Sequence, residues 1–319
     1  MTEWRTRWLL FGGGAILAVA LAAIATPARI VELVAHVDGQ GLAVAFVGCV
    51  LTFALRGVRL AVMLHPKLPA RRAFAAVAVS QFAAATLPLR LGELVFVPVL
   101  VRAGMPGTVA ALSWLVLLRA LDIAAFVVWV VAAAVWQGAS ATAGIAVLGG
   151  LMLATFLALG SGGALLGRLT RRLRHRRRRI RSALRQALAV RREFLRLART
   201  PWRALAVVVS SLAAWGAIWA TSVAALRAIG LAWSARTVLM GVIGASLGAS
   251  VPLNAFGSFG TLEAGWTAAL AASGVAARDA LAAGFVIHAW ALVCYGVIAI
   301  AGFAVLARSK GTEKASRAR

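Results

Sequence analysis

Long apolar runs, separated by short polar or basic clusters, recur from one end of the chain to the other. A helix needs about 20 residues to cross the hydrocarbon core of a bilayer. Eight segments approach or exceed that length: 8–27, 42–64, 73–101, 108–136, 143–167, 204–226, 237–274 and 282–307. The first follows a short basic head, as a signal peptide would, but its length and the further spans favour a retained helix. The pattern predicts an all-α integral membrane protein, a polytopic helical bundle.

Composition agrees with this class. Of the 319 residues, 62% are hydrophobic and 13% are charged, and the mean hydropathy is +0.90, values typical of a polytopic membrane protein. Cys49 and Cys294 both lie inside apolar runs, so no disulfide framework or metal-type spacing is expected. We therefore expect residues 1–319 to form a single transmembrane domain.

The basic residues predict which loops face the cytoplasm. Residues 168–203 carry 15 arginines and one acid, Glu193, and such loops lie on the cytoplasmic side, next to anionic headgroups. We expect this Arg-rich loop to contact the membrane surface rather than nucleic acid. Apolar residues at helical spacing within it predict an amphipathic helix. The basic tail, 308–319, is expected on the same side, which places both termini in the cytoplasm of a bacterial inner membrane.

Two apolar segments are interrupted by polar residues, one in each half of the chain. In each half, the placement of the basic loops requires one segment that enters and leaves on the same side of the membrane. Three apolar segments lie between the basic loop ending at Arg72 and the Arg-rich loop, and both loops are expected in the cytoplasm. Three crossings cannot return the chain to the same side, so one of the segments must be re-entrant. Segment 73–101 is broken by TLPLRLGE, and segment 237–274, in the second half, is broken at PLNAFGSFG. This predicts about six full spans plus two broken re-entrant segments. The two units then have opposite topology, an inverted repeat typical of transporters.

Three acids lie at predicted membrane depth: Glu93, Asp122 and Glu263. Arg90 and Arg119 each precede an acid by three residues, which places each pair on one face if the segment is helical. Ionisable residues inside a membrane mark functional sites by default. We interpret these groups as the lining of a polar cavity that handles a charged headgroup.

A purely structural interpretation of the same residues stays open. An N-cap at Gly260 would place Glu263 at the third helical position, where its carboxylate accepts from free backbone N–H groups. Snorkelling to the headgroups explains Arg59 well and Arg56, one turn deeper, less well. His288, alone in the last span, is expected to be a packed or hydrogen-bonded histidine rather than a proton relay.

Four motifs resemble the signature series of a known family. Residues Pro88–Leu94, Leu118–Asp122, Pro252 and Gly257–Gly265 resemble, in order and spacing, the lysylphosphatidylglycerol synthase transmembrane region, a flippase-like domain. The resemblance covers nearly the whole chain. It implies a flippase or transporter that moves a phospholipid or a lipid-linked intermediate between leaflets.

The predicted substrate-binding residues combine these motifs with the intramembrane charges: Arg90, Glu93, Arg119, Asp122, Asn254, Gly257, Gly260 and Glu263. Arg90 and the half-helix that starts near Thr261 would attract an anionic headgroup, because free N–H groups at a helix N-terminus favour phosphate. Glu93 and Glu263 would orient a cationic headgroup or couple movement to protons.

No enzymatic activity is expected. The four histidines are scattered, no metal-ligand spacing appears and no cofactor motif is visible. The chain continues for 12 residues after its last predicted span, without the aminoacyl-transferase domain that lysyl transfer requires. The main alternative is a non-catalytic scaffold that docks a separate lipid-modifying enzyme through the Arg-rich loop. An integral-membrane lipid transferase with Glu93 or Glu263 as its base is less favoured.

Overall fold

The computed structural model describes residues 27–88, 91–105, 107–140, 199–251 and 256–317, with a few single residues between 16 and 24 and between 185 and 197. Helices and short turns account for this part of the chain, which contains no strand. The predicted all-α membrane bundle is thereby confirmed. The predicted spans 8–27 and 143–167, and most of the Arg-rich loop, lie outside the described residues.

Four of the described helices are long and apolar enough to cross a membrane. They are α3 (Gly39–Leu64), α6 (Thr108–Trp136), α9 (Pro201–Ala228) and α12 (Ala277–Arg317), the last over its stretch Ala277–Arg308. Each coincides with a predicted full span. Large apolar side chains stay exposed on their outer faces, for example Val47 of α3 and Ile300 of α12, because lipid rather than water is the surrounding solvent. A short helix, α2 (Pro27–Ala35), precedes α3.

The first interrupted segment folds into a hairpin of two half-helices, α4 (Ala70–Thr86) and α5 (Leu91–Arg102). At the tip, a Cβ added to Gly92 would lie 1.8 Å from the carbonyl oxygen of Ala83, so only glycine permits this approach. At the open end, the Cβ position of Gly104 lies 4.0 Å from the carbonyl oxygen of Lys67. The segment therefore returns to the end of the bundle at which it started, as predicted.

The second interrupted segment forms a matching hairpin from α10 (Ala235–Gly248), the one-turn helix η2 (Phe256–Ser258) and α11 (Thr261–Ala272). A Cβ at Gly248 would meet the carbonyl oxygen of Thr261 at 2.0 Å, and one at Gly244 would meet that of Gly265 at 2.3 Å. Small residues let two helix backbones pack this closely. The hairpin starts with Ser234, whose side chain caps α10 by accepting from the Thr237 N–H.

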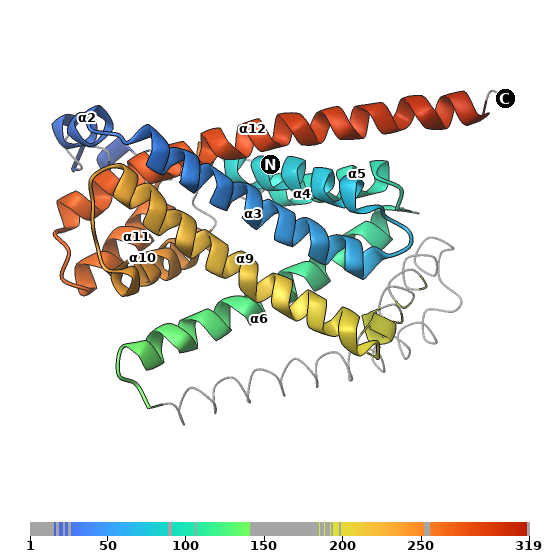
Figure 1. Ribbon diagram of the computed structural model, residues 1–319, viewed down its shortest axis with the longest axis horizontal. Coiled ribbons are helices and arrows are strands. Elements are labelled where there is room, and N and C mark those ends of the chain that lie inside the picture. Colours follow the sequence, from blue (N-terminus) through green and yellow to red (C-terminus); the bar gives the residue numbers. More distant parts are fainter. Residues whose placement is uncertain are drawn as a thin grey trace, which may run out of the picture.

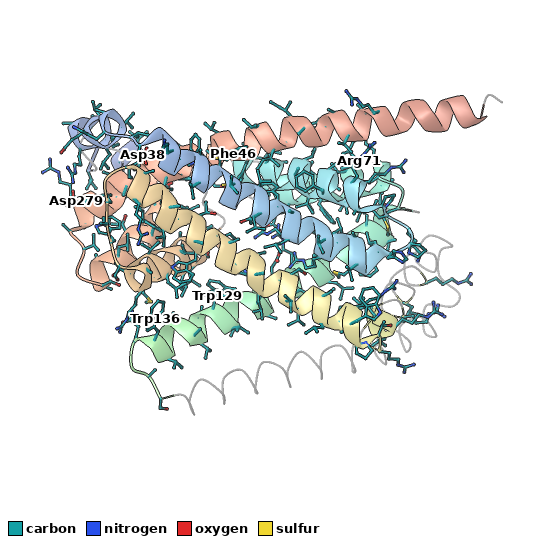
Figure 2. All side chains as sticks on the ribbon, in the orientation of Figure 1. Asp38, Phe46, Arg71, Trp129, Trp136 and Asp279 are labelled. Carbon is teal, nitrogen blue, oxygen red and sulfur yellow. The ribbon has the colours of Figure 1, made fainter. Side chains whose placement is uncertain are left out.

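The units α3–α6 and α9–α12 run in opposite directions, and α3 and α9 lie side by side and antiparallel along much of their length (Figure 1). The start of α3 meets the end of α9, where the Asp38 N–H donates to the carbonyl oxygen of Ala228 at 2.7 Å. Near the other end of α3, Arg59 donates to Ser211 of α9 at 3.3 Å. Asp38 and Asp279 lie at one end of the bundle and Arg71 at the other (Figure 2). The antiparallel pair is the arrangement expected for units of inverted topology.

Candidate functional site

A cavity of about 350 Å³ lies between the two units. All four long helices and both hairpins contribute to its wall. Two arginines, a glutamate and a histidine line it: Arg56, Arg119, Glu93 and His288. Further polar groups are the amide of Gln81 and the hydroxyls of Thr52, Thr221, Ser222, Ser246, Ser258 and Tyr295. The interior of this apolar bundle therefore contains a polar chamber.

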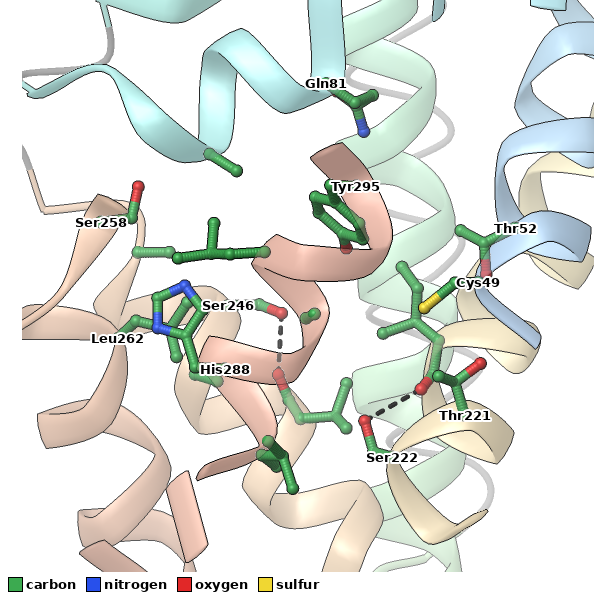
Figure 3. A pocket seen from close by; sticks show the side chains of 18 of the residues that line it. Cys49, Thr52, Gln81, Thr221, Ser222, Ser246, Ser258, Leu262, His288 and Tyr295 are labelled. Carbon is green, nitrogen blue, oxygen red and sulfur yellow. Dashed lines mark hydrogen bonds between the residues drawn. The ribbon is translucent and has the colours of Figure 1, made fainter. Parts of the chain in front are cut away.

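The tips of the two hairpins meet at this cavity because each hairpin turns back in the middle of the bundle. Gln81 comes from the last turns of α4, and Glu93 from the first turn of α5. Ser258 and Leu262 come from the tip of the second hairpin and lie across the cavity from Gln81 and Tyr295 (Figure 3). The one-turn helix η2 packs against α4. Both sequence interruptions are thus part of one site.

A chain of ion pairs forms one side of the site. The Arg119 Nε lies 3.1 Å from a Glu93 carboxylate oxygen, and its Nη1 lies 3.5 Å from Asp122. Asp122 also accepts from Arg59 Nη1 at 2.6 Å. Glu93 and Arg119 reach the cavity, whereas Asp122 lies behind it, beside a small void of about 40 Å³. Among the predicted residues, the structure brings these three together.

Arg56 contributes a further positive charge to the wall. It lies on α3 one helical turn before Arg59 and borders both the large cavity and the small void. Its Nε is buried and lacks a hydrogen-bond partner. Within the described part of the chain, no hydrogen bond or ion pair engages its guanidinium group.

Glu263 belongs to a second buried centre. Its side chain is 0% exposed. One carboxylate oxygen accepts from the Gly260 N–H at 2.7 Å, and the other lies 2.5 Å from His288 Nδ1. Glu263 is the third residue of α11, so it satisfies a free backbone donor at the helix start. The expected helix cap is present, and His288, not Glu263, reaches the cavity.

Backbone geometry explains the glycines of this tip. Gly257 has φ 73° and Gly260 has φ 108°, values in the left-handed region that side chains disfavour. Neither glycine lines the cavity; they shape the turn that directs the Gly260 N–H at Glu263. The Phe259 ring packs against His288, with centroids 4.6 Å apart. Two predicted site residues, Arg90 and Asn254, lie outside the described residues.

Sequence reasoning did not place Arg56, Gln81, His288 or Tyr295 in the site. Two of them carried a usable signal: Arg56 is too deep to snorkel easily, and His288 is a lone histidine inside a span. Gln81 and Tyr295 gave none, because a single polar residue on an apolar helix does not reveal which face meets a cavity. Metal binding finds no support in the described part of the chain, where no group of three His, Cys, Asp or Glu side chains is close enough to hold an ion.

The fold and this cavity define a class: a polytopic helical membrane protein with two hairpins that meet around a charged chamber. A model of one family, the lysylphosphatidylglycerol synthase TM region, matches residues 10–301. The chain belongs to that family, and it is therefore a membrane protein related to lipid synthesis or flipping. No curated relative and no solved structure matches the chain.

Proposed function

We propose that the protein is a lipid flippase or lipid transporter that receives the headgroup of a phospholipid or lipid-linked intermediate in the cavity. The observation that carries this proposal is a chamber of about 350 Å³ with Arg56, Glu93, Arg119 and His288 in its wall, inside a bundle of apolar spans. Charged groups at membrane depth are costly and persist where they serve a substrate pathway. A headgroup is the substrate portion that needs such a polar shelter.

The two hairpins suggest how the headgroup would pass. Broken helices that meet between inverted units surround the substrate site in several transporter folds, and rocking of one unit against the other exposes the site to each side in turn. Here each hairpin contributes one wall, so such a rocking motion changes which side opens. The movement is passive or ion-coupled in this proposal. The acyl chains would stay among the exposed apolar side chains of the outer faces.

The distribution of basic residues supports an orientation for this transporter. Lys67, Arg71 and Arg102 lie at the open end of the first hairpin, and Arg203 lies beside them, with its Nη2 2.8 Å from His65 Nδ1. Loops rich in Lys and Arg face the cytoplasm. We place this end on the cytoplasmic side of a bacterial inner membrane.

Transport in reconstituted liposomes tests the function. The protein is inserted into vesicles that contain fluorescent phosphatidylglycerol, and a membrane-impermeant quencher reports the fraction of label that changes leaflet. Vesicles with wild-type protein should lose the protected fraction faster than protein-free vesicles. Ala85→Trp, which fills the cavity, should abolish the effect, whereas the matched control Val47→Trp, on the lipid-facing side of α3, should not. Equal rates in wild-type and protein-free vesicles, across several headgroups, would exclude the proposal.

A further inference from the structure

Arg56 differs from Arg59 and Arg119 because, in the described part of the chain, it forms no ion pair with a carboxylate. Arg59 is paired with Asp122 at 2.6 Å, and Arg119 with Glu93 at 3.1 Å. Among these described groups, three guanidinium groups face two carboxylates, so one positive charge is in excess. Arg56 is the one that lacks a carboxylate oxygen within 4.0 Å in the described part of the chain. A cation at membrane depth without an ion-pair partner is costly unless something else compensates for its charge.

The position of Arg56 indicates where that compensation would come from. The residue lines the large cavity together with Gln81 and Tyr295, whose amide and phenol groups are hydrogen-bonding partners for an oxyanion. A guanidinium group binds phosphate through two parallel N–H···O bonds, a geometry that lysine cannot reproduce. The two terminal nitrogens of a guanidinium group form such a fork.

We propose that Arg56 binds the phosphate group of the lipid substrate, so the protein selects lipids whose headgroup carries a phosphate over lipids without one. This inference rests on the proposed function and names its substrate class. Phosphate in the cavity would bring the described charges of the Arg56, Arg59, Arg119, Glu93 and Asp122 cluster into balance.

Thermal stability distinguishes an arginine that binds a ligand from one that stabilises the fold. If Arg56 is an unpaired charge awaiting a ligand, Arg56→Gln should unfold at an equal or higher temperature than wild type in phosphate-free detergent. Arg59→Gln, the matched control in an ion pair, should unfold at a lower temperature because it leaves Asp122 without its closest partner. A lower melting temperature for Arg56→Gln would mean that the side chain is structural, and would overturn the proposal.

Binding selectivity supplies the second test. Native mass spectrometry of protein in mixed micelles would compare phosphatidylglycerol with a glycosyl diacylglycerol, which lacks phosphate, and with inorganic phosphate alone. Wild type should enrich phosphatidylglycerol over the phosphate-free lipid by about tenfold or more, the effect of hydrogen bonds to a charged group. Arg56→Gln should remove that enrichment, and Arg56→Lys should keep part of it. Wild type without preference, an Arg56→Gln variant with full preference, or inorganic phosphate that binds as tightly as the lipid would each contradict a lipid phosphate site.

The two proposals fail in different ways. If wild type moves a phosphate-free lipid between leaflets and Arg56→Gln does so equally well, the flippase proposal stands and the phosphate assignment fails. If the protein binds phosphatidylglycerol through Arg56 but moves no lipid, the binding site stands and transport fails.

Discussion

Glu93 and Glu263 occupy the same position in the two hairpins but behave differently. Each is the third residue of the second half-helix, α5 or α11. Glu93 is 26% exposed, lines the cavity and is paired with Arg119 of another span. Glu263 is 0% exposed and is bound by its own hairpin and by His288. The two inverted units thus share the position of a carboxylate in the hairpin, but the two carboxylates make different contacts.

The hairpins also differ in how their arms pack. At the first hairpin, the close backbone approach occurs at Gly92. In the second hairpin, Gly244, Gly248 and Gly265 bring α10 and α11 into contact over more than one turn. The second tip is therefore fixed by backbone packing and by a buried carboxylate, whereas the first presents its carboxylate to the cavity. We expect the stability of the fold to depend on the second tip and the rate of transport on the first.

Removal of Glu263 is expected to have the largest effect on stability. Glu263→Ala leaves the Gly260 N–H without its acceptor and His288 Nδ1 without its partner in a buried site, which should cost about 3 kcal/mol of unfolding free energy. Glu93→Ala should cost less than about 1 kcal/mol, because its pair is partly exposed. Thermal unfolding of both variants in detergent measures the contrast. Equal destabilisation would show that the two tips are not specialised, and Glu263→Gln should fall between alanine and wild type.

The next largest loss of stability is expected where the backbones of α10 and α11 are in contact. Gly248→Ala would push a methyl group to 2.0 Å from the carbonyl oxygen of Thr261, and overpacking of this kind costs about 1–3 kcal/mol. Gly39→Ala is the matched control, since nothing lies within 4 Å of the Cβ it adds. The melting temperature should fall for the first variant and stay unchanged for the second. An unchanged Gly248→Ala protein would mean that α10 and α11 separate at little cost.

Much of the fold was predictable because its signals are local or additive. Apolar run length located the four described spans, and the count of basic loops identified the two broken segments. The cap at Glu263 was predictable from its spacing in the sequence. In a capping box, a glutamate three residues after the N-cap residue accepts from the backbone N–H of that residue. The cavity wall was not predictable in the same way. Arg56 and His288 line one cavity only because α3 and α12 pack around the same space, and long-range packing leaves no pattern in a single sequence.

The pairing of the charges was also only partly predictable. The spacing of Arg119 and Asp122 indicated their contact, which the structure contains at 3.5 Å. The shorter contact of Asp122 is with Arg59, 63 residues earlier. A short spacing identifies which charges share a helix face, but the strongest partner comes from whichever helix packs against that face.

Neutralisation of Glu93 should change transport more than stability. Glu93→Gln keeps the size of the side chain but leaves Arg119 with one fewer counter-ion, which raises the positive charge of the cavity. We expect roughly a tenfold change in the leaflet-exchange rate, the usual scale for a charge-assisted hydrogen bond, with an unfolding free energy within about 1 kcal/mol of wild type. Glu263→Gln, assayed per folded molecule, is the companion variant. If Glu263→Gln alters the rate more than Glu93→Gln, the division of tasks between the two tips is wrong.

The smallest effect is expected outside both tips. Arg29 of α2 pairs with Glu32 at 2.7 Å and with Asp279 at 2.9 Å, and the three side chains are partly to largely exposed. The Arg29 hydrogen bond lowers the pKa of Glu32 from its ordinary 4.5. A carboxyl with a lowered pKa stabilises the fold above its ordinary pKa and loses that contribution as the pH falls through the lowered value. Melting temperatures of wild type and Arg29→Gln should therefore stay parallel between pH 7 and pH 5 and converge only in more acidic buffer. A divergence of the two melting temperatures between pH 7 and pH 5 would contradict this account of the Arg29–Glu32 pair.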